Sequence, residues 1–241
     1  MVKKNFKYLV PLSMFYTAVA LADLVLVYRM SRIGSLTITA GIFVMPLYYL
    51  LEDIIAELYG YEQVRQVIWS VQIAAVIFSI IVTLGNSLPQ PSGWHHAAAY
   101  NTVFGHVFRT ILGGGLIAML CGAFLNGYLL SKWKIYTRGR LFLLRSIGSS
   151  AIGQLVQTTL GCLLLYTGVL PLKTIFDMII PLYCIQLSGC ALISVPGAML
   201  VAWLKKSEGG DVLDHHCNFN PFKFAVTQSD DLPSFESTHL I

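Results

Sequence analysis

The chain has 241 residues, of which 56% are hydrophobic and only 12% are charged, and its formal net charge is +4. Soluble domains contain about 25% charged residues, and the mean hydropathy of +0.68 leaves too little polar sequence to coat a soluble core of this size. The composition therefore excludes an ordinary soluble protein and predicts an all-α integral membrane protein, because the apolar surplus must face lipid.

Six stretches are long enough to cross a hydrocarbon layer of about 30 Å as helices that rise about 1.5 Å per residue. In chain order they are 8–27, 36–59, 64–84, 110–130, 147–169 and 175–204. The last is overlong, and its Pro181, Gly189 and Pro196 predict one kinked or tilted helix rather than two spans. We expect a six-transmembrane-helix bundle over residues 1–206 and a polar, disordered tail over residues 207–241.

The distribution of basic residues predicts how the bundle is oriented. Lysines and arginines gather before the first span, between the fourth and fifth spans, and after the sixth span, at Lys3, Lys4, Lys7, Lys132, Lys134, Arg138, Arg140, Arg145, Lys205 and Lys206. The long loop over residues 85–101 contains no lysine or arginine. Both termini are therefore expected in the cytoplasm, and since these anchors account for the net charge, no nucleic-acid partner is implied.

Motifs for cofactors, metals and enzymatic chemistry are absent from the sequence. It has no nucleophile elbow, no Gly-rich nucleotide loop and no HExxH pair. Four cysteines fall within predicted spans and lack the spacing of a zinc site, namely Cys121, Cys162, Cys184 and Cys190. In a span, cysteines are expected to act as small apolar residues. We expect no cofactor, no metal and no enzymatic activity.

Three carboxylates stand at the end of the second predicted span, in "LLEDIIAELYGYEQVRQ" (50–66). If Gly60 marks its cytoplasmic end, Glu57 lies about 4–5 Å deep, Asp53 about 10 Å and Glu52 about 12 Å. An ionisable residue within the membrane is expensive and is a functional-site hypothesis by default. The sequence therefore predicts a substrate site that uses these side chains.

Polar residues of two other spans reach comparable depths. In the fifth span these are Ser149, Gln154 and Gln157, and in the fourth span Asn126. Carboxylates only accept hydrogen bonds, whereas amides both donate and accept. Together with aromatic residues in the spans, such a set suits a flat, polar, aromatic ligand such as a guanine-like ring.

Structural roles are the alternatives for the same residues. Glu57 could pair with Arg65 or Arg145 at the cytoplasmic boundary. The glutamines could instead join helices through interhelical hydrogen bonds, a common use of such residues in membranes. Depth alone leaves both interpretations open.

Several blocks of the sequence, taken in order, resemble one family of membrane proteins. They are "DIIAELYGYEQVRQVIW" (53–69), Arg109, "CGAFLNGYLLSKWK" (121–134) and "LFLLRSIGSSAIGQLVQTTLG" (141–161). This combination is similar to the queuosine precursor transporter family, also called the vitamin uptake transporter family. The resemblance implies a six-helix importer in the cell inner (cytoplasmic) membrane. Its cargo would be 7-cyano- or 7-aminomethyl-7-deazaguanine, or queuine, for tRNA modification.

The resemblance also implies substrate-binding roles for particular residues of this chain, namely Asp53, Glu57, Arg109, Arg145, Ser149 and Gln154. The family commonly has an acidic residue where this chain has Asn126, and another where it has Gln157. These two departures leave the exact base and the coupling ion open. We also assign both positions, and Glu52, to the predicted substrate site.

Other classes of protein and of partner stay open at this stage. An intramembrane enzyme could use Glu52, Asp53, His106 or the arginines as catalytic groups, and a structural subunit would use none of them. As a transporter of the same family, the protein could also carry another purine-like or vitamin-like substrate. Besides a small-molecule substrate and membrane lipid, a second copy of the chain or an energy-coupling partner is compatible with the sequence.

Overall fold

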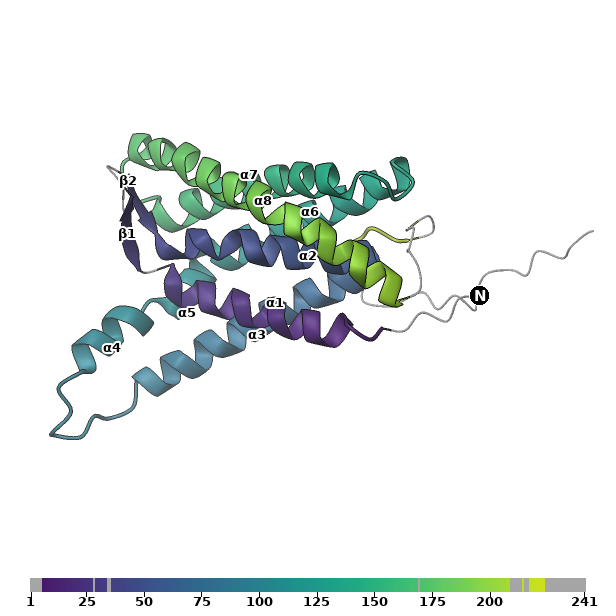
Figure 1. Ribbon diagram of the computed structural model, residues 1–241. Helices are drawn as coiled ribbons and strands as arrows, with labels where there is room; N and C mark the ends of the chain where they lie inside the picture. Colours follow the sequence, from purple (N-terminus) through teal and green to yellow (C-terminus); the bar gives the residue numbers. More distant parts are fainter. Residues whose placement is uncertain are drawn as a thin grey trace, which may run out of the picture.

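The computed structural model describes residues 6–27, 29–33, 36–168, 170–208, 214 and 217–223. Its long helices run back and forth along one direction (Figure 1). They are α1 (Leu9–Leu26), α2 (Met45–Tyr59), α3 (Tyr61–Asn86), α6 (Leu116–Tyr136), α7 (Phe142–Tyr166) and α8 (Leu172–Glu208). Each of the six predicted spans therefore corresponds to a helix.

The shorter elements gather at one end of the bundle, which we call the hairpin end (Figure 1). They are β1 (Met30–Ile33), β2 (Leu36–Thr39), the 3-10 helix η1 (Ala40–Phe43), α4 (Ala97–Phe104), α5 (Val107–Thr110) and the π-helical turn η2 (Ile111–Gly115). The opposite end, the Gly60 end, holds the α2–α3 turn, where Gly60 has a φ of 84° that favours glycine. Glu208 at the end of α8 accepts hydrogen bonds there from the Tyr8 backbone N–H (3.0 Å) and the Tyr59 hydroxyl (2.6 Å).

Four helical segments of the described chain are long and apolar enough to cross a membrane. They are Leu9–Leu26, Tyr61–Asn86, Ala97–Tyr136 and Leu172–Glu208. The prediction of a mostly helical membrane protein is thereby confirmed. Helix α2 is not among the four because it has only 15 residues, and α7 because serine, threonine and glutamine lower its hydropathy. The count of six spans and the cytoplasmic termini stay predictions.

The second predicted span begins differently from the expectation. Residues 36–39 form β2, which pairs antiparallel with β1, Met30 lying opposite Thr39 and Ile33 opposite Leu36. Helix α2 begins only at Met45, after η1, with Pro46 in its first turn. The β-branched residues of "TIT" (37–39) favour extended backbone, and proline suits the first turn of a helix.

Part of the tail expected to be disordered packs against the bundle instead. We call Asp214 and residues 217–223 the C-terminal strap. The buried Arg65 donates from Nη1 to the carbonyls of Asn218 (2.8 Å) and Asn220 (3.0 Å). Trp69 Nε1 donates to the Pro221 carbonyl at 2.8 Å. Arg65 is thus held by the strap, so these tail residues pack on the bundle and differ from the expected disorder. Ser207 and Glu208 end α8, and the other residues of the tail lie outside the described residues.

Two further contacts fix the strap on the first turn of α3. The Tyr61 backbone N–H lies 3.2 Å from both carboxylate oxygens of Asp214, and burial raises the pKa of the Asp214 carboxyl. The Phe219 ring packs 5.0 Å from the Tyr61 ring and 5.4 Å from the Tyr128 ring. Burial also raises the pKa of the Cys217 thiol to about 12, so this cysteine is expected to be a poor nucleophile.

Helix α2 is the central helix of the bundle. It contacts α1, α3, α6, α7 and α8, and every residue from 51 to 60 is buried. Its carboxylates therefore face neighbouring helices rather than lipid, which is the arrangement that intramembrane acids require.

Close approach of α6 and α7 depends on glycine at position 153. A Cβ added there would lie 2.9 Å from both the Gly122 carbonyl oxygen and the Asn126 Cβ. We expect Gly153→Ala to destabilise the protein by about 1–3 kcal/mol, because the two helices must separate. Gly161→Ala on the same helix is the matched control, since its added Cβ would meet Ala118 at an ordinary 3.8 Å.

Thermal unfolding of the purified variants in detergent measures the difference. The control is expected to be neutral or to gain up to about 1 kcal/mol, because alanine favours helix over glycine. Equal melting temperatures for Gly153→Ala and Gly161→Ala would contradict the tight crossing.

Candidate functional site

Glu52 and Asp53 are adjacent on α2, completely buried, and joined by one amide from another helix. Asn126 of α6 donates from Nδ2 to Glu52 Oε1 at 2.9 Å and to Asp53 Oδ1 at 2.8 Å. We call Glu52 and Asp53 the carboxylate pair. The structure thus brings together three of the residues that the sequence assigned to a common depth.

Hydroxyl groups of α1 and α7 supply the remaining donors to the carboxylate pair. The Tyr16 hydroxyl donates to Glu52 Oε2 at 3.2 Å. Ser146 and Ser150 donate to Asp53 Oδ2 at 2.5 Å and 3.3 Å. Ser149, which the sequence singled out, donates instead to the Ser146 carbonyl at 3.2 Å within its own helix. Every oxygen of the pair has a donor, which is how buried charges are tolerated.

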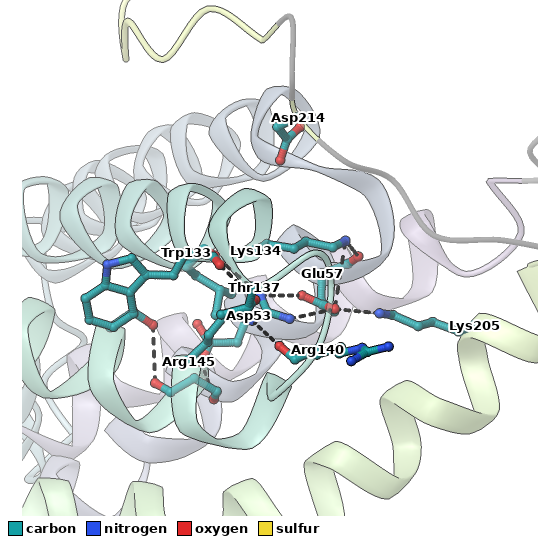
Figure 2. Close-up of polar contacts among 12 residues, drawn as sticks. Asp53, Glu57, Trp133, Lys134, Thr137, Arg140, Arg145, Lys205 and Asp214 are labelled. Atoms are coloured by element: carbon teal, nitrogen blue, oxygen red, sulfur yellow. Dashed lines mark hydrogen bonds and ion pairs between the residues drawn. The ribbon is translucent and has the colours of Figure 1, made fainter.

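Glu57 lies one turn further along α2 and meets three basic side chains (Figure 2). Arg145 donates to the Glu57 carboxylate from both terminal nitrogens, Nη1 to Oε2 at 3.0 Å and Nη2 to Oε1 at 3.1 Å. Lys205 Nζ lies 2.5 Å from Oε1, and Lys134 Nζ lies 3.8 Å from the same oxygen and 2.5 Å from the Glu57 carbonyl. We call these four residues the Glu57 cluster. Of the two structural alternatives for Glu57, the structure contains the pairing with Arg145.

The tight α6–α7 turn places Arg145 for this contact. Arg138, Gly139 and Leu141 all have positive φ angles, of 52°, 76° and 57°. The chain thereby folds back so that Arg145 Nε donates to the Arg140 carbonyl at 2.9 Å. With one side of its guanidinium fixed, the arginine presents its two terminal nitrogens to the carboxylate, a geometry with both strength and specificity.

Glutamines of α7 contact tyrosines and a cysteine on neighbouring helices. Gln157 accepts from the Tyr49 hydroxyl at 2.7 Å and donates to the Tyr48 hydroxyl at 2.5 Å, and the two tyrosine rings stack 4.9 Å apart. Gln154 Nε2 lies 2.6 Å from Cys190 Sγ. The Gln154 carbonyl oxygen is buried and accepts no hydrogen bond from the part of the chain that the structure describes.

A partly open cavity of about 130 Å³ lies beside Gln157, toward the hairpin end. It exceeds the roughly 10–15 Å³ that one water needs, and is smaller than the roughly 300–1,000 Å³ pockets of drug-sized ligands. Its wall is mostly apolar, with polar side chains from Asp23, Thr39, Gln157, Thr158 and Gln186. Thr158 donates to the Gln186 carbonyl oxygen at 2.7 Å. The cavity thus suits one small, partly polar molecule.

Asp23 and Gln186 of this wall were missed by the sequence-based selection of site residues. Asp23 stands alone in "ALADLVL" (20–26), inside the first predicted span. An acid inside a span is the same signal that singled out Asp53, so this residue could have been found from the sequence.

Arg109 does not join the carboxylates. It is exposed on α5, which lies at the hairpin end (Figure 1), whereas Glu57 stands in the last turn of α2 beside Gly60 and pairs with Arg145. Its binding role, implied by the resemblance, stays a prediction. Among the described residues, no group of three histidine, cysteine or acidic side chains could hold a metal ion.

Long apolar helices around a buried polar centre, with a small cavity beside it, define a multi-pass membrane protein. Residues 39–201 match the family model described as "Putative vitamin uptake transporter", and the chain belongs to this vitamin uptake transporter family. The resemblance seen in the sequence is thereby confirmed. Membership of a transporter family favours transport over enzymatic catalysis.

A bacterial relative supports the same assignment. The chain is 28% identical over 179 residues to a protein of Bacillus subtilis (strain 168) named "Probable queuosine precursor transporter". The alignment covers 71% of this chain and 75% of the relative. No solved structure matches the chain.

Proposed function

We propose that this protein imports queuosine precursors through the cell inner membrane, where they serve tRNA modification. The cargo would be a small 7-deazaguanine such as 7-cyano- or 7-aminomethyl-7-deazaguanine, or queuine. The observation that carries the proposal is the cavity beside Gln157, whose amide, carboxylate and hydroxyl groups can read the edge of a flat heterocycle. The family and the name of the Bacillus subtilis relative support the same cargo.

In this proposal the predicted site residues divide into two groups. Gln157 lines the cavity and meets the ligand, and Gln154, Asn126 and the carboxylate pair form the buried polar layer behind it. Arg145 and the rest of the Glu57 cluster hold helices α2, α6, α7 and α8 together at the Gly60 end. The cytoplasmic termini and the six spans are part of the same proposal, with the Gly60 end facing the cytoplasm.

Binding and uptake together test the proposed function. A ligand at about 100 times its Kd adds about 2.7 kcal/mol of stability, which for a chain of this size raises Tm by about 5–10 °C. We expect this shift with a 7-deazaguanine and none with an unrelated vitamin, and accumulation of the same compound inside proteoliposomes. Gln157→Leu is expected to abolish both signals.

Thermal stability without ligand separates binding from a purely structural role of Gln157. Interhelical hydrogen bonds in membranes average about 0.6 kcal/mol, so a structural role predicts only a modest loss of stability. Neither stabilisation nor accumulation of any deazaguanine by the intact protein would refute the proposed cargo. Chemical conversion without transport would instead favour the enzyme alternative.

A further inference from the structure

One acidic side chain of the cavity wall has an oxygen without a hydrogen-bond donor. Asp23 of α1 is 9% exposed, and its Oδ1 accepts no hydrogen bond from the described chain. The acids of α2 differ in this respect. Every oxygen of the carboxylate pair has a donor, and Glu57 has Arg145 and two lysines.

The cavity itself supplies no positive charge to Asp23. Among the described residues that line it, none is lysine, arginine or histidine. An isolated carboxylate in an apolar setting is costly unless a cation or several donors face it. A cation or hydrogen-bond donor on a molecule in the cavity can therefore pair with Asp23, for which the described wall offers no cation.

The backbone of η1 packs directly against this oxygen. Gly41 of η1 also lines the cavity, and a Cβ added at Gly41 would collide with Asp23 Oδ1 and lie 3.4 Å from the Val27 backbone. Glycine at this position lets the carboxylate lie against η1 at the wall. Other parts of the same wall carry the Gln157 amide and the Thr158–Gln186 pair, so the ligand can be polar along its ring edge as well.

We propose that Asp23 binds a protonated amine on the ligand, with the polar edge of a small planar ring directed toward Gln157 and Gln186. This inference rests on the proposed function and narrows it. Of the two precursor types, the aminomethyl compound carries an ammonium group at neutral pH, whereas the nitrile of the cyano compound has no proton to donate. The protein should therefore prefer the aminomethyl compound.

Affinities for both compounds in wild type, Asp23→Asn and Asp177→Asn test the proposal. Asp177 of α8 is exposed and serves as the matched control. Wild type should bind 7-aminomethyl-7-deazaguanine more tightly than the cyano compound. Asp23→Asn should weaken only the aminomethyl compound, by about tenfold or more, because a hydrogen bond to a charged group is worth about 1.5–3 kcal/mol. The control should bind both as wild type does.

A second variant covers the outcome in which Asp23→Asn fails to fold. Gly41→Ala crowds Asp23 Oδ1 without removing the charge, and the same selective loss of the aminomethyl compound is expected. The measurements are repeated with sodium replaced by choline. If binding of both compounds needs sodium, and Asp23→Asn removes that need, the partner of Asp23 is an inorganic ion and the inference is overturned.

Other outcomes separate this inference from the proposed function. If wild type binds both compounds and Asp23→Asn changes neither, or weakens both alike, the inference falls while the proposed function stands. If wild type binds neither compound, the proposed function falls together with the inference.

Discussion

Replacing Glu57 with glutamine is expected to destabilise the protein by about 3–5 kcal/mol, the usual effect of removing one partner from a buried ion pair. The substitution would leave Arg145, Lys134 and Lys205 gathered around a neutral amide, with Arg145 and Lys134 almost completely buried. Since these side chains belong to three helices that converge on α2, their repulsion would open the Gly60 end of the bundle. Thermal or denaturant unfolding in detergent measures the loss.

Two further variants make the Glu57 experiment specific. Asp177→Asn removes an exposed acid on α8 and is expected to change the free energy of unfolding by less than about 0.5 kcal/mol. Adding Lys205→Met to Glu57→Gln should recover part of the loss, because one of the unpaired cations is removed. A Glu57→Gln protein as stable as the Asp177→Asn protein would contradict a structural role for the cluster.

Replacing Asn126 with leucine is expected to cost about 3 kcal/mol or more and to abolish ligand binding. The change removes the single donor shared by Glu52 and Asp53, and each hydrogen bond to a charged group is worth about 1.5–3 kcal/mol. Two ordinary interhelical hydrogen bonds would together contribute only about 1 kcal/mol. The unfolding free energy therefore distinguishes a charged centre from simple helix contacts.

Two further variants control for the Asn126→Leu experiment, one at an exposed asparagine and one that changes only the chemistry at position 126. Asn101→Leu, on the exposed face of α4, is expected to change stability by less than about 0.5 kcal/mol. Asn126→Asp introduces the acidic residue that the resemblance implies for this position, but a carboxylate cannot donate to its two neighbours, so it too should destabilise this chain. Stability of Asn126→Leu within about 1 kcal/mol of wild type would show that the carboxylates have other donors.

The predicted depths correctly grouped Asn126 with the carboxylate pair, for a simple physical reason. Neighbouring helices rise at nearly the same rate, so residues at equal depth such as Asp53 and Asn126 can meet. Depth says nothing about which side of a helix a residue faces. Ser149 and Ser150 have nearly the same predicted depth, and the resemblance implies a role for Ser149. In the structure Ser146 and Ser150, four residues apart and on one face of α7, make the contact.

The other differences between prediction and structure arose because average composition does not show local features of the chain. The residues before α2 are as apolar as a span, so the strand β2 was read as part of a helix. The tail is polar on average, which predicts disorder. In the structure, however, Phe219 packs against Tyr61 and Phe222 against Trp69, and these two aromatic contacts hold the strap on the bundle. Asp23 was overlooked because one acid barely changes the hydropathy of the first span.

The burial of α2 has a consequence for biosynthesis. Asp53 leaves the ribosome 73 residues before Asn126 and 93 residues before Ser146, two of its hydrogen-bond donors. A helix that enters lipid alone with a carboxylate at its centre is penalised by about 2.5–3.5 kcal/mol per acid. On emergence, α2 has only α1 beside it, and the Tyr16 hydroxyl reaches Glu52 but not Asp53. We therefore expect α2 to stay with the insertion machinery until α6 and α7 have been made, so that α2 takes its place in the bundle after them although it is translated before them.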